Sequence, residues 1–304
     1  MKRLFAVLAV LAVVAPWAPA IGQKTTIGVS LPQDDNPFYI AMLKGIRARA
    51  GELGWDVVYV SSQEDKAKQI NGVQDLIARG VKGILISPID STGVNAAYDA
   101  AAAAKIPIVS VARGSSSPNQ TLHVAMDEKR IGRDIGAWIA ASAGGKGKVA
   151  FIAGPPGSPT FKNLTDGVKE SLAKGGLQVV FEQYGALTRE RGLKLAEDAL
   201  TANPDLVAIY AANDDVALGA AQAVQAAGKK GKVKVTGMNG IPPALRAVGD
   251  GTLSLTVELN PVNWGRLGVD VLAGYLKGEK YKQQVFIKHE LIDAKNIGVK
   301  MPKS

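Results

Sequence analysis

The segment TIGVSLPQDDNPFY (residues 26–39) contains the unit from which this fold is built. Its first six residues form a short apolar, β-branched run, which predicts a buried strand followed by a polar loop. Asn36 and Pro37 then predict a helix start, because Asn caps backbone N–H groups and Pro fits the first helical position. The segment therefore predicts strand, loop and helix in that order, with Phe38 and Tyr39 in the first helical turn beside the end of the strand.

The same alternation continues along the chain. Strands are predicted at residues 26–31, 56–61, 83–87, 106–111, 122–126, 149–152, 178–184, 206–211, 233–238 and 255–258. Helices are predicted at residues 37–53, 66–79, 93–104, 131–143, 161–174, 189–202, 216–227, 242–248 and 262–277. Parallel strands joined by crossover helices produce this rhythm, so the predicted fold class is α/β with doubly wound parallel sheets.

The chain is predicted to form two lobes of one architecture. In each half the first and second strands start about thirty residues apart, as expected when one structural unit is repeated. The seam is expected near Met126 and Asp127, with a further crossing after Glu258, which makes a multi-strand hinge. The predicted N-terminal lobe comprises residues 24–126 and 260–287. The predicted C-terminal lobe comprises residues 127–259 and 288–304.

The composition disfavours most catalytic chemistry. The 304 residues include no cysteine and only two histidines. The chain therefore has no thiolate nucleophile and no disulfide, and it has few ligands for a metal cluster or a Ser/His/Asp triad. The chain contains neither a P-loop motif nor a G-x-G-x-x-G placed between a strand and a helix. These observations predict binding without catalysis, with no metal and no cofactor.

The first 22 residues are predicted to be a signal peptide. A basic start at Lys2 and Arg3 precedes a twelve-residue apolar run, residues 4–15, which is too short to cross a bilayer. Small residues allow cleavage after either Ala20 or Gly22. We therefore expect a periplasmic protein, and the lack of cysteine predicts that it has no lipid anchor.

The net charge of +9 does not predict a nucleic-acid partner. The densest basic group, residues 229–234, lies between a predicted helix and a predicted strand, where a solvated turn explains it. A nucleic-acid surface favours basic residues interleaved with aromatic ones, or a recognisable docking helix, and neither is found.

Ligands of open α/β sheets bind beyond the carboxyl ends of the strands, where the loops converge. Phe38 and Tyr39 offer an aromatic face suited to a sugar ring, although core packing explains them equally well. Arg113 directly follows an apolar strand, so it is either a ligand contact or one half of an ion pair between lobes. Asn213 and Asn239 occupy equivalent loop positions, and each is either a helix cap or a ligand contact.

Several segments together resemble the ribose-binding-like sugar receptors of ABC importers, a type I periplasmic binding protein family. The resemblance covers nearly all of the chain after the leader and rests on residues 36–39, 86–90, 106–109, 213–220 and the segment at Pro261. It implies a monomeric two-lobed clamp, in which three hinge strands join the lobes and a monosaccharide is buried between them. It also implies a membrane permease as the partner.

The resemblance implies specific ligand contacts. The positions that match the family pattern are Asn36, Phe38, Tyr39, Arg113, Asn213 and Asn239, the last standing where an aspartate is usual. The positions that depart from the pattern are Ala112 for an acidic residue, Leu164 for an arginine, Leu187 for an aromatic residue and Leu259 for a glutamine. Alignment through residues 154–160 is the weakest step, so Thr160, Phe161 or Lys162 is expected to line the pocket if Leu164 does not.

These departures make the predicted pocket unusually apolar. A buried hydroxyl group that loses its hydrogen bond costs about 1–3 kcal/mol. We therefore expect a solute with fewer hydroxyl groups than ribose, or with differently arranged ones. A deoxy sugar, a short polyol and a small ring compound all meet this description.

Three other functions share features with this pattern. A ligand sensor that feeds a chemoreceptor or a histidine kinase is compatible with the same clamp. A glycoside hydrolase would need paired acids drawn from Asp34, Asp35, Asp214 and Asp215, but acids at helix starts need no reaction to explain them. A lactose-repressor-type regulator needs a DNA-binding headpiece, and the first strand begins too soon after the leader to leave room for one.

Overall fold

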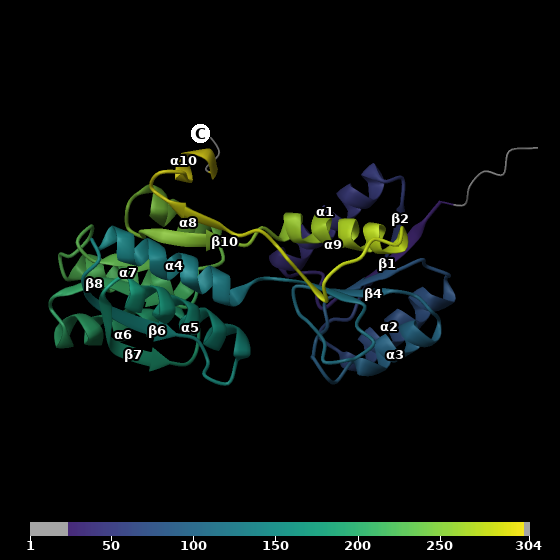
Figure 1. The fold of residues 1–304 in the computed structure, drawn as a ribbon, viewed down its shortest axis with the longest axis horizontal. Coiled ribbons are helices and arrows are strands. Elements are labelled where there is room, and N and C mark those ends of the chain that lie inside the picture. The colour runs from purple at the N-terminus through teal and green to yellow at the C-terminus, as the bar shows by residue number, and fades with distance from the viewer. Residues whose placement is uncertain (1–23, 301–304) are drawn as a thin grey trace, which may run out of the picture.

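Residues 24–300 are described by a computed structural model, in which the chain forms two α/β lobes (Figure 1). The predicted signal peptide, residues 1–22, lies outside the described residues. Each lobe contains a six-stranded sheet, with strand order β11-β5-β4-β3-β1-β2 in the first and β12-β10-β9-β8-β6-β7 in the second. The predicted fold class, two doubly wound lobes, is confirmed.

The first lobe places its sheet between two pairs of helices. Its strands are β1 (Thr26–Leu31), β2 (Asp56–Ser61), β3 (Ile84–Ile86), β4 (Ile108–Val111), β5 (Leu122–Ala125) and β11 (Gln284–Phe286). Its helices are α1 (Pro37–Glu52), α2 (Lys66–Ala78), α3 (Asn95–Ala103) and α9 (Pro261–Leu276). Figure 1 shows α1 and α9 on one face of the sheet and α2 and α3 on the other, and all strand pairs in this lobe are parallel.

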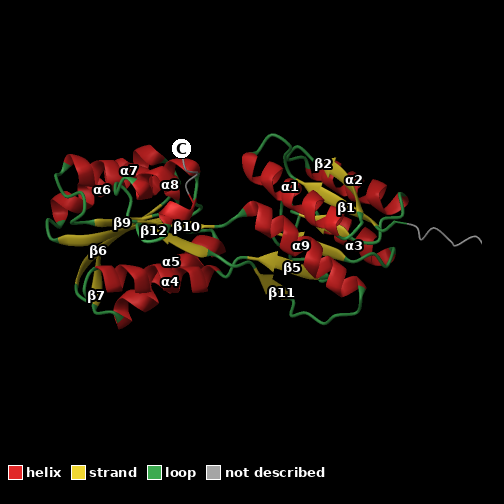
Figure 2. Ribbon diagram, turned by 90° about the horizontal axis from the view of Figure 1, so that it is seen from above, coloured by secondary structure: helices red, strands yellow, loops and turns green. Residues whose placement is uncertain are grey.

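The second lobe repeats this arrangement. Its strands are β6 (Gly147–Ala153), β7 (Leu177–Tyr184), β8 (Leu206–Ala211), β9 (Lys234–Thr236), β10 (Leu255–Glu258) and β12 (Glu290–Asp293). Its helices are α4 (Glu128–Ser142), α5 (Pro159–Lys174), α6 (Arg189–Ala202), α7 (Asp214–Ala226), α8 (Pro242–Gly249) and α10 (Ile297–Lys300). Figure 2 shows α4 and α5 on one face of the sheet and α6, α7 and α8 on the other.

One strand corrects the expectation of two purely parallel sheets. β12 pairs with β10 in the antiparallel sense, with Glu258 opposite Glu290. The reason is the hinge. β10 runs toward the crossing and leaves the second lobe at Glu258, whereas β12 enters the same lobe from that crossing. Two strands that meet the hinge in opposite directions must be antiparallel neighbours.

The chain passes between the lobes at three places. The crossings follow β5, follow β10 and separate β11 from β12, and Figure 1 shows these three connections between the lobes. The first and third crossings are tied together, because the backbone N–H of Ile287 donates to the carbonyl of Ala125 at 2.8 Å. Outside these crossings, no ion pair among residues 24–300 joins one lobe to the other.

Helices α1 and α9 approach each other until their backbones touch. A Cβ atom added at Gly45 would lie 2.0 Å from the carbonyl oxygen of Val262, and one added at Gly265 would lie 2.2 Å from that of Met42. Only glycine permits this approach. The contact fixes the first turn of α9 against the middle of α1.

Candidate binding site between the lobes

A cavity of about 530 Å³ lies between the lobes, and both lobes contribute to its walls. The lining residues of the first lobe include Phe38, Tyr39, Ala112, Arg113, His123 and Trp264. Those of the second lobe are Glu128, Thr160, Phe161, Met238, Asn239 and Leu259. The loops at the carboxyl ends of the strands therefore meet across the crossing, as the sequence predicts.

A second cavity of about 650 Å³ adjoins the first. The two share Phe38, Asn239 and Leu259, so they are parts of one cleft. The second cavity adds Ala41 from α1 and Ile241 from the loop before α8, both of which are apolar.

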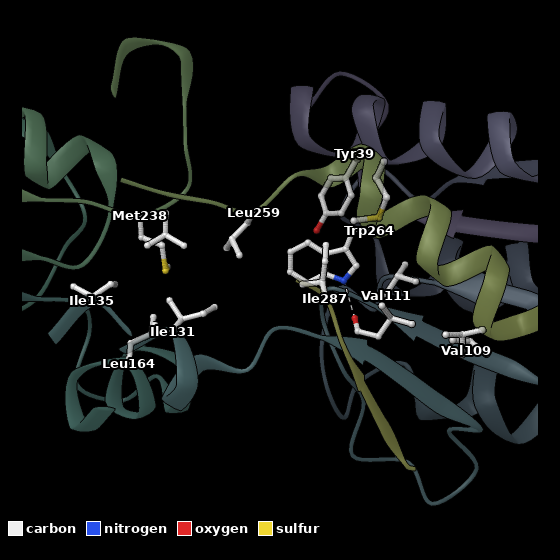
Figure 3. Packing of buried hydrophobic residues seen from close by; sticks show 14 of the residues in the cluster. Tyr39, Val109, Val111, Ile131, Ile135, Leu164, Met238, Leu259, Trp264 and Ile287 are labelled. Atoms are coloured by element: carbon white, nitrogen blue, oxygen red, sulfur yellow. Dashed lines mark hydrogen bonds between the residues drawn. The ribbon is translucent and has the colours of Figure 1, made fainter. Parts of the chain in front are cut away.

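Three aromatic rings form the wall on the side of the first lobe. The ring of Phe38 lies edge-on to Tyr39 at 5.3 Å and to Trp264 at 5.8 Å, measured between ring centroids. The indole Nε1–H of Trp264 donates to the carbonyl of Val124 on β5 at 2.8 Å, drawn as a dashed line in Figure 3. Tyr39 is 5% exposed, and burial raises the pKa of its phenol. The aromatic wall is thus held rigidly against a hinge strand.

Arg113 projects from the loop that follows β4. Its guanidinium carbon lies 5.7 Å from the centre of the Tyr39 ring, and its Nη1 lies 3.6 Å from Oε1 of Glu64, a distance too long for a strong ion pair. The side chain is 45% exposed. Because neither neighbour uses all of its N–H groups, the guanidinium can donate hydrogen bonds into the cleft.

The backbone is unusual at two positions in the cavity wall. Ala112 has a backbone φ of +63° and Asn239 has one of +124°, values that residues other than glycine rarely adopt. Such conformations cost on the order of 1–3 kcal/mol and persist only when the surroundings impose them. Ala112 directly follows β4, Asn239 lies three residues after the end of β9, and both line the cavity.

The loop that carries Asn239 is fixed by a buried carboxylate. Asp214 at the start of α7 is 0% exposed, and its Oδ2 accepts from the N–H of Ile241 at 2.9 Å. Its Oδ1 accepts from the hydroxyl of Thr256 on β10 at 2.6 Å. Burial raises the pKa of Asp214 to about 6, because these bonds offset only part of the lost hydration. Asp214 therefore ties α7, the Asn239 loop and the hinge strand β10 together.

Of the three residues suggested for the start of α5, two line the cavity. Phe161 packs directly on Gly154, where an added Cβ would lie 2.3 Å from the ring, and Thr160 lies beside it in the wall. Lys162 does not line the cavity, and its ammonium group pairs with Asp166 one turn along the helix.

Leu164 lies elsewhere than the family pattern implies. Its side chain is 0% exposed and belongs to the hydrophobic core, and Figure 3 shows it beside Ile131 of α4. The carbonyl of Leu164 lies so close to Gly132 that α4 and α5 are in backbone contact there. Leu164 therefore serves the packing of two helices and does not line either part of the cleft, and its contact with a ligand stays a prediction.

Three further predicted contacts do not line either part of the cleft. Asn36 caps α1 by accepting from the N–H of Phe38 at 2.9 Å, and Asn213 caps α7 by accepting from the N–H of Val216 at 3.0 Å. Leu187 packs against the core of the second lobe. The capping interpretation of both asparagines is confirmed, and ligand contact by these three residues stays a prediction.

The sequence interpretation missed Trp264, His123, Met238 and Glu128, all of which line the cavity. A signal for Trp264 was available. Asn260 and Pro261 begin α9 in the same way that Asn36 and Pro37 begin α1, and each pair is followed by an aromatic residue in the first turns. His123 is partly used, since its Nε2 lies 3.1 Å from the carbonyl of Ala112, and burial lowers its pKa.

The four aspartates considered for hydrolysis do not meet at this cavity. Asp214 is buried and hydrogen-bonded, and Asp215 pairs with Arg189 at 3.3 Å. Asp34 and Asp35 are exposed in the loop before α1 and do not line the interlobe cavity. No group of three side chains suited to a metal ion occurs within residues 24–300. Glu128 is the single carboxylate among the residues that line the interlobe cavity.

Comparisons with known proteins agree with this geometry. A family model described as a periplasmic binding protein domain matches residues 27–280. The ribose import binding protein of Salmonella typhimurium is 34% identical over 292 residues, covering 96% of this chain and 98% of the relative. The D-allose-binding periplasmic protein of Escherichia coli is 33% identical over 258 residues, covering 81% of this chain and 82% of the relative.

Two solved structures are also similar to this chain in sequence and in fold. A periplasmic ribose ABC transporter protein from Conexibacter woesei is 29% identical, with a TM-score of 0.84, covering 92% of this chain and 95% of the other. An ABC transporter solute binding protein from Mycobacterium smegmatis, with bound glycerol, is 32% identical, with a TM-score of 0.73, covering 93% of this chain and 98% of the other.

Proposed function

We propose, because this chain belongs to the periplasmic binding protein family, that it captures a sugar or sugar-like solute between its lobes and delivers it to the permease of an ABC importer. The observation that carries this proposal is the composition of the interlobe cavity, which has an aromatic wall from one lobe and an amide and apolar wall from the other. Neither wall alone can enclose a solute.

The proposed mechanism is closure gated by the ligand. A solute that lies against Phe38 and Arg113 gains the contacts of Phe161 and Asn239 only when the lobes approach. Binding therefore shifts the population toward the closed form, by the difference in binding free energy between the two forms. The closed form presents both lobes in one fixed arrangement, which a permease can distinguish from the open form.

The preferred solute is proposed to carry fewer hydroxyl groups than ribose. Met238, Leu259 and Phe161 offer no hydrogen bond, so much of the wall from the second lobe is apolar. Each buried hydroxyl group left without a partner costs about 1–3 kcal/mol. A deoxy sugar or a short polyol avoids this cost. Of the ligands named for the relatives, glycerol meets this description, whereas ribose and D-allose do not.

The location and the absence of catalysis are also proposals. Export and cleavage after Ala20 or Gly22 would place the mature chain in the periplasm, and the sequence of the leader supports this. No helix within residues 24–300 has the length and apolar character of a membrane span. The solute is released unchanged, since no paired acids line the cavity.

A thermal-shift screen tests the proposal, because a solute that binds only the folded chain raises its melting temperature. The screen uses D-ribose, 2-deoxy-D-ribose, D-allose, myo-inositol and glycerol, followed by calorimetry on each solute that raises it. We expect 2-deoxy-D-ribose to bind more tightly than D-ribose. Tighter binding of D-ribose would contradict the proposed preference, and no binding by any of the five would contradict the solute class. Chromogenic glycosides should release no product.

A further inference from the structure

We propose that Glu128 determines specificity by accepting a hydrogen bond from a hydroxyl group of the bound solute, on the wall of the cavity opposite Arg113. This inference rests on the proposed function and deepens it. It assigns the solute two polar ends, one that accepts from Arg113 and one that donates to Glu128, with an apolar face between them.

Glu128 lies in the second lobe, next to the hinge. It is the first residue of α4, directly after the first crossing, and it lines the cavity together with Thr160 of α5. Capping does not explain it, because Asp127 already caps the helix by accepting from the N–H of Arg130 at 2.9 Å. An acid at this position still stabilises the helix start, so the experiment must separate that effect from ligand binding.

The charged groups of the cavity are complementary. Among the residues that line it, Glu128 is the only carboxylate and Arg113 the only guanidinium. A guanidinium only donates hydrogen bonds, and an ionised carboxylate only accepts them. A hydroxyl group does both, so a small polyol held between the two walls can satisfy Arg113 with one oxygen and Glu128 with the hydrogen of another.

No basic residue among residues 24–300 forms an ion pair with Glu128. The neighbouring basic residues on α4 are engaged elsewhere: Arg130 pairs with Asp134 at 3.2 Å, and Lys129 and Arg133 lie within 4.0 Å of Glu170. Burial raises the pKa of Glu128, so water solvates its charge poorly. A hydroxyl donor that meets this carboxylate replaces solvation that folding has already removed, which makes the contact stronger than one at an exposed acid.

The test compares Glu128→Gln and Glu128→Ala with Glu190→Gln. Glu190 is the matched control, because it is also an acid in the first turn of a helix, α6, but it is exposed and does not line the cavity. Each variant is titrated by calorimetry with D-ribose, 2-deoxy-D-ribose, D-allose, myo-inositol and glycerol. For every solute that binds the wild-type protein, we expect Glu128→Gln to weaken binding about 10-fold or more and Glu190→Gln to leave it unchanged.

Two results would overturn the inference. If Glu128→Gln lowers the melting temperature as Glu190→Gln does but binds every solute with wild-type affinity, Glu128 only stabilises the helix start. The second result concerns the single variants Arg113→Glu and Glu128→Arg and the double variant that combines them. If both single variants lose affinity and the double variant regains it, the two side chains pair directly on closure and do not contact the solute. A wild-type protein that binds none of the five solutes is a separate result, which contradicts the proposed function itself.

Discussion

The ring of Phe38 meets the indole of Trp264 almost edge-on, with ring centroids 5.8 Å apart and planes at 77°. These residues come from the starts of α1 and α9, more than two hundred positions apart in the chain. The indole is in turn anchored to Val124 on the hinge strand β5. The aromatic wall of the cavity is therefore a preformed surface that needs no rearrangement when a solute arrives, which lowers the ordering cost of binding.

Replacing Phe38 with Ala should weaken solute binding by about 10–100-fold, because it removes the ring that a solute would contact and leaves Trp264 without its edge-on neighbour. Phe38 is only half-buried, so the free energy of unfolding should fall much less than for a core residue. Calorimetry and urea unfolding measure the two effects. Ile40→Ala is the control, since Ile40 is 51% exposed on the same helix and does not line the cavity between the lobes. Unchanged affinity in Phe38→Ala would mark the ring as packing only.

Two glycines of α1 should respond in opposite ways to alanine. Gly45→Ala places a Cβ against the backbone of Val262, which cannot move without separating α1 from α9, so we expect a loss of about 3 kcal/mol or more in the free energy of unfolding. Gly51→Ala meets nothing within 4 Å and should gain up to about 1 kcal/mol from helix propensity. Urea unfolding of both variants checks this. A neutral Gly45→Ala variant would show that the helices can separate at little cost.

The buried carboxylate of Asp214 should make stability depend on pH. Its pKa is about 6 in the folded chain, against an ordinary value of 3.8, so the folded form binds the proton more readily than the unfolded form. This group therefore contributes its full stabilisation below pH 3.8 and loses it as the pH rises through about 6, with an upper limit of about 3 kcal/mol. The amide of Asp214→Asn can accept from Ile241 and donate to Thr256 without burying a charge.

The measurement is the difference in unfolding free energy between wild type and Asp214→Asn from pH 4.5 to 7.5, which cancels the contributions of other acids. We expect the variant to gain on the wild type as the pH rises. A difference that stays constant over this range would contradict the assignment.

Much of the fold followed from local sequence pattern, because the features concerned are themselves local. The strand at residues 26–31 and the helix at residues 189–202 were predicted with their observed bounds, since an apolar run marks the strand and capping residues flank the helix. The direction of β12 was not predicted. Periodicity reveals which residues are buried but not which way a strand runs, and direction here depends on where the chain crosses the hinge.

The site was harder to predict, because its residues meet only through the fold. Arg113 was placed at the cavity by its position just beyond a strand, and Phe161 only as an alternative to Leu164 where the match to the family is weakest. Leu164 was not distinguishable from Phe161 by sequence, since the two lie one helical turn apart and only the contact of Leu164 with Gly132 shows which one is covered by α4. Trp264 depends on a hydrogen bond to a residue 140 positions away.

In the proposed mechanism, a bound solute draws the two lobes together around it. The chain has no cysteine of its own that a spin label could modify. Cysteines introduced at the exposed positions Asn119 in the first lobe and Asn163 in the second can therefore carry a pair of spin labels. We expect the distance between the labels to shorten when calorimetry shows saturation with a solute of the panel, and to remain long in Phe38→Ala at the same concentration. A distance between the labels that does not change at saturation would contradict closure of the lobes around the solute.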